Sequence, residues 1–191
     1  MKYVVGIGNP EDKYRGTRHN IGFRAADDLA GEKKWQHNAS LQAEICEPQE
    51  GVWLLKPQTY VNLTGRTVSL LKERFLAQPA EVLVVCDDVN LVFGKLRLRS
   101  SGSSGGHHGL ENVIQELGSD AFSRLRIGVG SERMPKDLAG FVLQRFGKEE
   151  EKLLPEVMGK GVSICRAWIL EGYTAAEKEL SRLQSNQQEK S

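Results

Sequence analysis

Short apolar runs along the chain alternate with segments whose apolar residues recur at helical spacing. The apolar runs predict strands at 3–8, 43–46, 52–56, 82–85 and 124–130, and the strict alternation of 95–99 predicts another. Helical spacing predicts helices at 22–31, 62–76 and 110–117, and most of 136–183 is also predicted to be helical. Strands that alternate with helices predict an α/β fold, a single-domain mixed β-sheet with helices on both faces.

Length and composition fit one folded unit. The chain has 191 residues, of which 39% are hydrophobic and 27% charged, as in ordinary globular proteins. We expect one domain over 1–184 and a frayed polar tail over 185–191. No apolar run approaches the ~18 residues of a membrane span, and no signal peptide precedes the first strand, so we expect a cytoplasmic protein. The three cysteines are far apart and are expected to be buried free thiols: Cys46, Cys86 and Cys165.

Charge changes this picture only locally. The 26 Lys and Arg residues nearly cancel the 25 Asp and Glu residues, and the net charge of +1 alone does not favour a nucleic-acid partner. Between Val89 and Leu110, however, Lys95, Arg97 and Arg99 stand in a window without any acidic residue. Period-two spacing puts the three cations on one strand face, which suits phosphate oxygens, although a charged, solvated edge strand explains it equally well.

Polar residues at the ends of predicted strands are candidates for chemistry, because sites in open α/β sheets collect there. Asn9 follows the first strand, and Asp87 and Asp88 follow another. These positions also suit turn formers and helix caps. His19 lies in a loop where no apolar periodicity explains an imidazole, and a carboxylate such as Asp87 would make it a plausible general base.

Three rival motifs are weaker. The stretch 102–106 reads Gly-x-Ser-x-Gly and makes Ser104 a candidate hydrolase nucleophile, but no histidine lies late in the chain, where that triad requires one. Gly6-Ile7-Gly8 begins a dinucleotide fingerprint that the next residues break. Cys86, Asp87 and the His107-His108 pair lack the spacing of metal ligands. We therefore expect neither a cofactor nor a metal.

Several blocks together resemble bacterial-type peptidyl-tRNA hydrolases, in matching order and spacing from residue 3 to at least residue 147. The blocks are 5–10, Tyr14, 17–22, 56–65, 85–88 and 105–110. The resemblance implies hydrolysis of the ester that joins a peptide to tRNA in peptidyl-tRNA released from stalled ribosomes. It implies water as the nucleophile, His19 as the general base, Asp87 as the acid that holds it, and no metal.

The same resemblance implies the binding residues. Asn9 and Asn62 match asparagines that hold the peptide backbone and the attacking water, and Asn9 also serves in distinguishing blocked from free aminoacyl groups. The other implied contacts, with the peptide or with the acceptor stem of the tRNA, are Tyr14, Tyr60, His108, Arg99 and Arg124. The two arginines match a basic pair that clamps a phosphate, which a guanidinium recognises bidentately. We expect peptidyl-tRNA as the partner, no membrane association, and a monomer.

Three positions depart from the family pattern. His108 replaces the usual asparagine of its loop, Val61 replaces a methionine before Asn62, and Glu11 replaces a glycine after Asn9-Pro10. An imidazole cannot reproduce the paired donor and acceptor of an amide, so the substrate contact of His108 is the role most affected. The alternative hypothesis is a non-catalytic RNA-binding protein on the same fold, against which the presence of His19, Asp87 and both asparagines argues.

Overall fold

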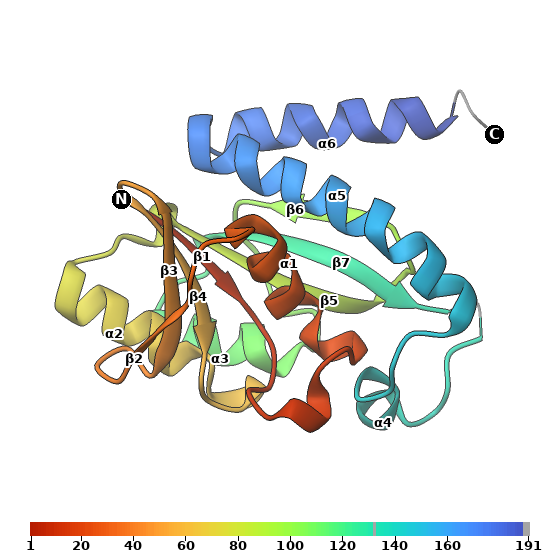
Figure 1. Cartoon of the computed structure of the whole chain (residues 1–191), viewed down its shortest axis with the longest axis horizontal. Helices are drawn as coiled ribbons and strands as arrows, with labels where there is room; N and C mark the ends of the chain where they lie inside the picture. Colours follow the sequence, from red (N-terminus) through yellow and green to blue (C-terminus); the bar gives the residue numbers. More distant parts are fainter. Residues whose placement is uncertain (132, 189–191) are drawn as a thin grey trace.

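A seven-stranded mixed sheet forms the middle layer of the molecule (Figure 1). The structure, a computed structural model, describes residues 1–131 and 133–188. The strand order is β2-β3-β4-β1-β5-β7-β6. Strands β4, β1, β5 and β7 run parallel, while β2, β3 and β6 pair antiparallel with their neighbours. The strands are β1 (Lys2–Gly6), β2 (Gln36–Asn38), β3 (Ala43–Gln49), β4 (Val52–Pro57), β5 (Val82–Val92), β6 (Leu96–Arg99) and β7 (Ser123–Gly130).

Helices cover both faces of this sheet, as predicted (Figure 1). One face carries α1 (Ile21–Ala30), α5 (Lys148–Glu171) and α6 (Tyr173–Gln188), and the other carries α2 (Gly65–Phe75) and α3 (His108–Leu117). The short α4 (Leu138–Val142) lies beyond the sheet edge that carries the carboxyl end of β5. Two buried apolar clusters result, one on each face, because the central parallel strands contribute side chains to both.

Two glycines bring α1 close to the carboxyl ends of β1 and β5. A Cβ atom on Gly22 would lie 2.3 Å from the carbonyl oxygen of Val85, and one on Gly6 would lie 2.3 Å from the carbonyl oxygen of Gly22. Neither position therefore accepts a side chain without a backbone shift. This close approach places the segment before α1, which carries His19, beside the middle of β5.

The predicted elements are present, with three differences. β5 continues through Asp87 and Asp88 to Val92, so the two aspartates lie inside the strand and not after it. The polar strand β2 has no apolar pattern and was not predicted. α6 extends to Gln188, into the expected tail, while 189–191 lie outside the described residues.

The three cysteines are free and buried, as expected. Across residues 1–131 and 133–188, no helix is long and apolar enough to cross a membrane.

Candidate active site

Two histidines meet one buried carboxylate at the end of the sheet. Asp87 on β5 has a side chain only 2% exposed, and its Oδ1 lies 2.7 Å from Nδ1 of His19 and 3.0 Å from Nε2 of His107. His19 belongs to the 3-10 turn Arg18–Asn20 that precedes α1, and His107 is the N-cap of α3. Three segments far apart in sequence thus converge on one carboxylate oxygen.

The hydrogen bonds assign the ring protons of both histidines. Nδ1 of His107 accepts from the backbone N–H of Leu110 at 3.2 Å, so its Nε2 carries the proton that is donated to Asp87. His19, which lines the cleft, donates to the same oxygen from Nδ1, so in the neutral ring Nε2 is the nitrogen without a proton. Burial raises the pKa of Asp87, but His107 and then His19 outweigh burial and hold that pKa below its usual range. Asp87 therefore remains a carboxylate at neutral pH.

A partly buried ion pair fixes the turn that carries His19. Arg18 donates from both terminal guanidinium nitrogens to the two carboxylate oxygens of Glu150, each at 2.7 Å, and also reaches the carbonyl of Val129. Its guanidinium carbon lies 4.4 Å from the ring centroid of Phe141 in α4. Arg18 thus ties the turn before α1 to the first turn of α5 and to α4.

Asn9 is held from two sides. Its backbone N–H donates to Oδ1 of Asn20, and Nδ2 of Asn20 donates to its carbonyl, both at 2.9 Å. Its own Oδ1 accepts from the backbone N–H of Val61 at 3.1 Å. The Nδ2 group of Asn9 has no hydrogen-bond partner in the described part of the chain, so it remains a free donor at the cleft. Asn9 is both a structural cross-link and an available amide.

A cleft of about 580 Å³ opens in front of these residues. Asn62 and Tyr60 line one side of it, following β4. The other side is an apolar rim formed by α4 and its C-terminal neighbour, with Leu138, Ala139, Val142 and Leu143. The cleft therefore combines an imidazole, free amide groups and an apolar wall.

The two arginines of β7 differ in their surroundings. Arg126 lines the cleft, where it donates to Oδ2 of Asp88 at 3.3 Å and to the carbonyl of Ser103 at 2.8 Å. Arg124 is only 1% exposed, and its guanidinium donates to the carbonyls of Gly102, Asp120 and Phe122. In this position Arg124 supports the Ser/Gly loop from beneath and presents no donor to solvent.

Comparison with known proteins agrees with this geometry. A model of the peptidyl-tRNA hydrolase family matches residues 3–190. The chain belongs to this family. Proteins named peptidyl-tRNA hydrolase from Desulfitobacterium hafniense and Chloroflexus aggregans are 43% and 44% identical, covering 90% and 92% of this chain and 95% and 96% of theirs. A crystal structure of peptidyl-tRNA hydrolase from Acinetobacter baumannii, 28% identical, covers 94% of both chains with a TM-score of 0.86.

The remaining residues implied by the family resemblance lie in different places. His108 lines the cleft, but its side chain is 83% exposed, and its Nδ1 lies 3.6 Å from Glu111. Arg99 is exposed on the edge strand β6, with Lys95 and Arg97 also exposed beside it. Tyr14 does not belong to the cleft lining among the described residues; the Nζ of Lys13 lies 4.9 Å from its ring centroid.

The structure also bears on the serine-hydrolase and metal-site alternatives. Ser104 Oγ accepts from the backbone N–H of Gly106, and no histidine nitrogen bonds it within the described residues. His19, Asp87 and His107 place their ligand atoms within 4.8 Å of one another, as metal ligands do. The Nε2 of His107 carries a proton, however, because its Nδ1 is already an acceptor, so this donor set fits a hydrogen-bonded triad better than a resident ion.

Sequence reasoning missed three residues of this site. The sequence indicates His107 only as a possible metal ligand, because its position before a predicted helix does not show that it lies beside Asp87. Arg126 and Asn20 carried no distinguishing signal, because the sequence does not show which arginine of a buried strand faces a cleft or which loop amide clamps Asn9.

Proposed function

We propose that this chain hydrolyses the ester between a peptide and tRNA, with water activated by His19. The observation that carries the proposal is the contact of 2.7 Å between Nδ1 of His19 and buried Asp87, which leaves Nε2 of His19 as a proton acceptor at the cleft. As water attacks, the imidazole takes up a proton, and the adjacent carboxylate stabilises the resulting positive charge. The C–O bond between the acyl group and the ribose then breaks, and the protonated imidazole returns its proton to the departing ribose oxygen, so the products are the peptide acid and free tRNA.

The amides of the cleft suit the acyl part of the substrate. Nδ2 of Asn9 is a free donor. Asn62 provides a second, exposed amide from the 3-10 turn Val61–Leu63, which follows β4. An amide both donates and accepts, so these two side chains can hold a peptide backbone and orient the water. Tyr60 adds an aromatic wall beside them.

Basic residues on one side of the cleft suit the tRNA. Arg126 lines the cleft itself, and Arg97 and Arg99 of β6, with Lys95 just before this strand, are exposed to solvent. We propose that Arg99 contacts a phosphate of the acceptor stem. Because Arg124 is buried, we propose that it acts only indirectly, by holding the loop above it.

Replacement of His19 tests the proposal. His19→Ala should lower the rate of peptide release from peptidyl-tRNA by at least about 10²-fold, the contribution typical of a general base. His37→Ala is the matched control, because His37 is exposed on the edge strand β2 and far along the sheet from the cleft. Release by His19→Ala at the parent rate would remove His19 as the base, and tRNA binding by the parent without any release would favour the RNA-binding alternative.

The cleft is complete within one chain, which supports the proposal of a monomer that acts on free peptidyl-tRNA in the cytoplasm. Size-exclusion chromatography with light scattering at assay concentration should give the mass of one chain, 21.3 kDa. A dimer mass would contradict this part of the proposal.

A further inference from the structure

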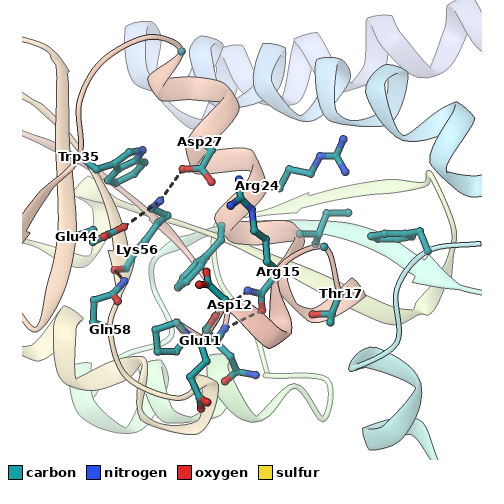
Figure 2. Close-up of a pocket in the computed structure, with 18 of the residues that line it drawn as sticks. Glu11, Asp12, Arg15, Thr17, Arg24, Asp27, Trp35, Glu44, Lys56 and Gln58 are labelled. Carbon is teal, nitrogen blue, oxygen red and sulfur yellow. Dashed lines mark hydrogen bonds and ion pairs between the residues drawn. The ribbon is translucent and has the colours of Figure 1, made fainter.

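A second groove lies beside the catalytic cleft and shares Asn9 with it (Figure 2). Its volume is about 710 Å³. Figure 2 shows Asp27 and Arg24 of α1 on one side, Lys56 and Gln58 from the end of β4 and the loop after it on another, and Glu11 at the lower end of the view. Nothing in the proposed hydrolysis uses this groove.

The order of the strands places the groove on the side of the sheet opposite to β6, the strand proposed to contact the tRNA. The reacting groups sit after the end of β1 and within β5, in the middle of the sheet. The exposed cations of β6 lie beyond β7 on one side, and the groove opens over β4 on the other. If the tRNA approaches from the β6 side, as the proposed function requires, the peptide leaves the ester toward β4.

The lining chemistry favours a peptide over a nucleic acid. Four acidic and four basic side chains line the groove, so it has no excess of cations to attract phosphates. Trp35 is half-buried there, and Nζ of Lys56 lies 4.1 Å from its ring centroid. Lys56 also pairs with Asp27 at 2.8 Å and Glu44 at 3.2 Å, which fixes these charges in place. An aromatic face among fixed polar groups suits an extended polypeptide.

A hydrogen bond links a residue that lines the cleft to a residue that lines the groove. Tyr60, which lines the cleft, donates its hydroxyl proton to Oε1 of Glu11, which lines the groove, at 2.5 Å. The other carboxylate oxygen of Glu11 pairs with Lys13 at 2.8 Å. Beneath this bridge, Asn9 accepts from the backbone of Val61.

We propose that the second groove binds the peptide portion of the substrate beyond the residues held in the cleft, and that the Glu11–Tyr60 bridge is the partition that a longer peptide must open. This inference rests on the proposed function and adds a preference for peptide length. Short acyl groups remain within the cleft, so the groove does not affect the rate of their release. Longer peptides gain binding free energy from contacts with the groove, and part of this gain is offset by the free energy needed to break the Glu11–Tyr60 hydrogen bond.

The test compares two substrates on the same tRNA, one carrying an N-acetylated amino acid and one carrying an N-acetylated hexapeptide that ends in that amino acid. The readout is the ratio of kcat/KM for the hexapeptide to kcat/KM for the single residue. Trp35→Ala should lower the ratio about fivefold, the change that ~1 kcal/mol of lost aromatic contact produces. Glu11→Ala should raise the ratio about threefold, because the partition is then open.

Lys13→Ala is the matched control, because it removes the outer ion pair and leaves the bridge in place. Its ratio should equal that of the parent. Thermal unfolding of each variant separates a folding defect, which lowers both rates together, from a change in the ratio. Release of both acyl groups with the same ratio in Trp35→Ala and the parent would overturn the groove proposal alone. Failure of the parent to release either acyl group would overturn the proposed function and the groove with it.

Discussion

Asp87→Asn separates the charge of the central carboxylate from its shape. Both histidines donate to the same oxygen, Oδ1, so an asparagine side chain with its carbonyl in that place can still accept both hydrogen bonds. What the variant lacks is the negative charge that faces the imidazole of His19 as it takes up a proton. The substitution therefore tests electrostatic stabilisation without removing the side chain that spaces the two rings.

The contact distance sets the expected size of the effect. With Nδ1 of His19 at 2.7 Å from Oδ1, the imidazolium and carboxylate charge centres lie roughly 4 Å apart, where an effective dielectric constant of about 20 gives about 4 kcal/mol. Since each 1.36 kcal/mol is a tenfold change in rate, kcat should fall about 10³-fold. The loss should appear in kcat and not in KM, because the charge on His19 develops only during water attack.

Single-turnover release of a blocked amino acid from tRNA measures this effect. Asp88→Asn is the matched control, since Asp88 is the next residue, is buried, and pairs with Arg126 instead of a histidine. It should alter kcat less than about tenfold. A folded Asp87→Asn protein that retains kcat within about tenfold of the parent would refute the argument that the carboxylate stabilises His19.

The remaining predictions concern stability and RNA binding. The fold lowers the pKa of Asp87, so ionisation of this carboxyl stabilises the folded parent at pH values above about 3.9, the pKa of an unfolded aspartate. In urea titrations, the stability advantage of the parent over Asp87→Asn should therefore shrink as the pH falls below about 4. An advantage that grows toward acid pH would contradict this prediction. Glu150→Ala leaves Arg18 buried without its partner and should lower the free energy of unfolding by about 3 kcal/mol. Glu149→Ala, which removes an exposed ion pair, should lower it by less than ~0.5 kcal/mol. Equal losses in the two variants would contradict a stabilising role for the Arg18–Glu150 pair. Arg99→Ala should reduce the salt slope of tRNA binding by about 0.9, and an unchanged slope would exclude a phosphate contact there.

Much of the fold was predictable because the central strands are apolar runs and the helices that cover them are amphipathic. The strand β2 was not, since its exposed residues Gln36–Asn38 are held by pairing with β3 and carry no hydrophobic pattern. The extension of β5 through Asp87 and Asp88 was missed for the opposite reason. Two aspartates normally end a strand, but here one is stabilised by histidines and the other by an arginine from elsewhere in the chain.

The candidate site was predictable only where a residue type had no structural explanation. His19 is a candidate because it is an imidazole in a loop, and Asp87 because it is a polar residue at the end of an apolar run. The structure places these two side chains in contact. His107 joins the same carboxylate through its position at the N-terminus of α3, which depends on a turn geometry that residue spacing does not encode. Which of Arg124 and Arg126 faces the cleft depends on packing beneath the Ser/Gly loop.

The central claim is that the cleft releases an acyl group from tRNA by attack of water at a peptide-like ester. The most direct measurement compares release of the same amino acid from tRNA when its amino group is acetylated and when it is free. The free amides of Asn9 and Asn62 and the apolar wall beside them suit a neutral acyl amide better than a charged ammonium group. The account predicts fast release from the acetylated ester and slow release from the free one. Equal rates for the two esters, or no release from the acetylated one, would contradict it.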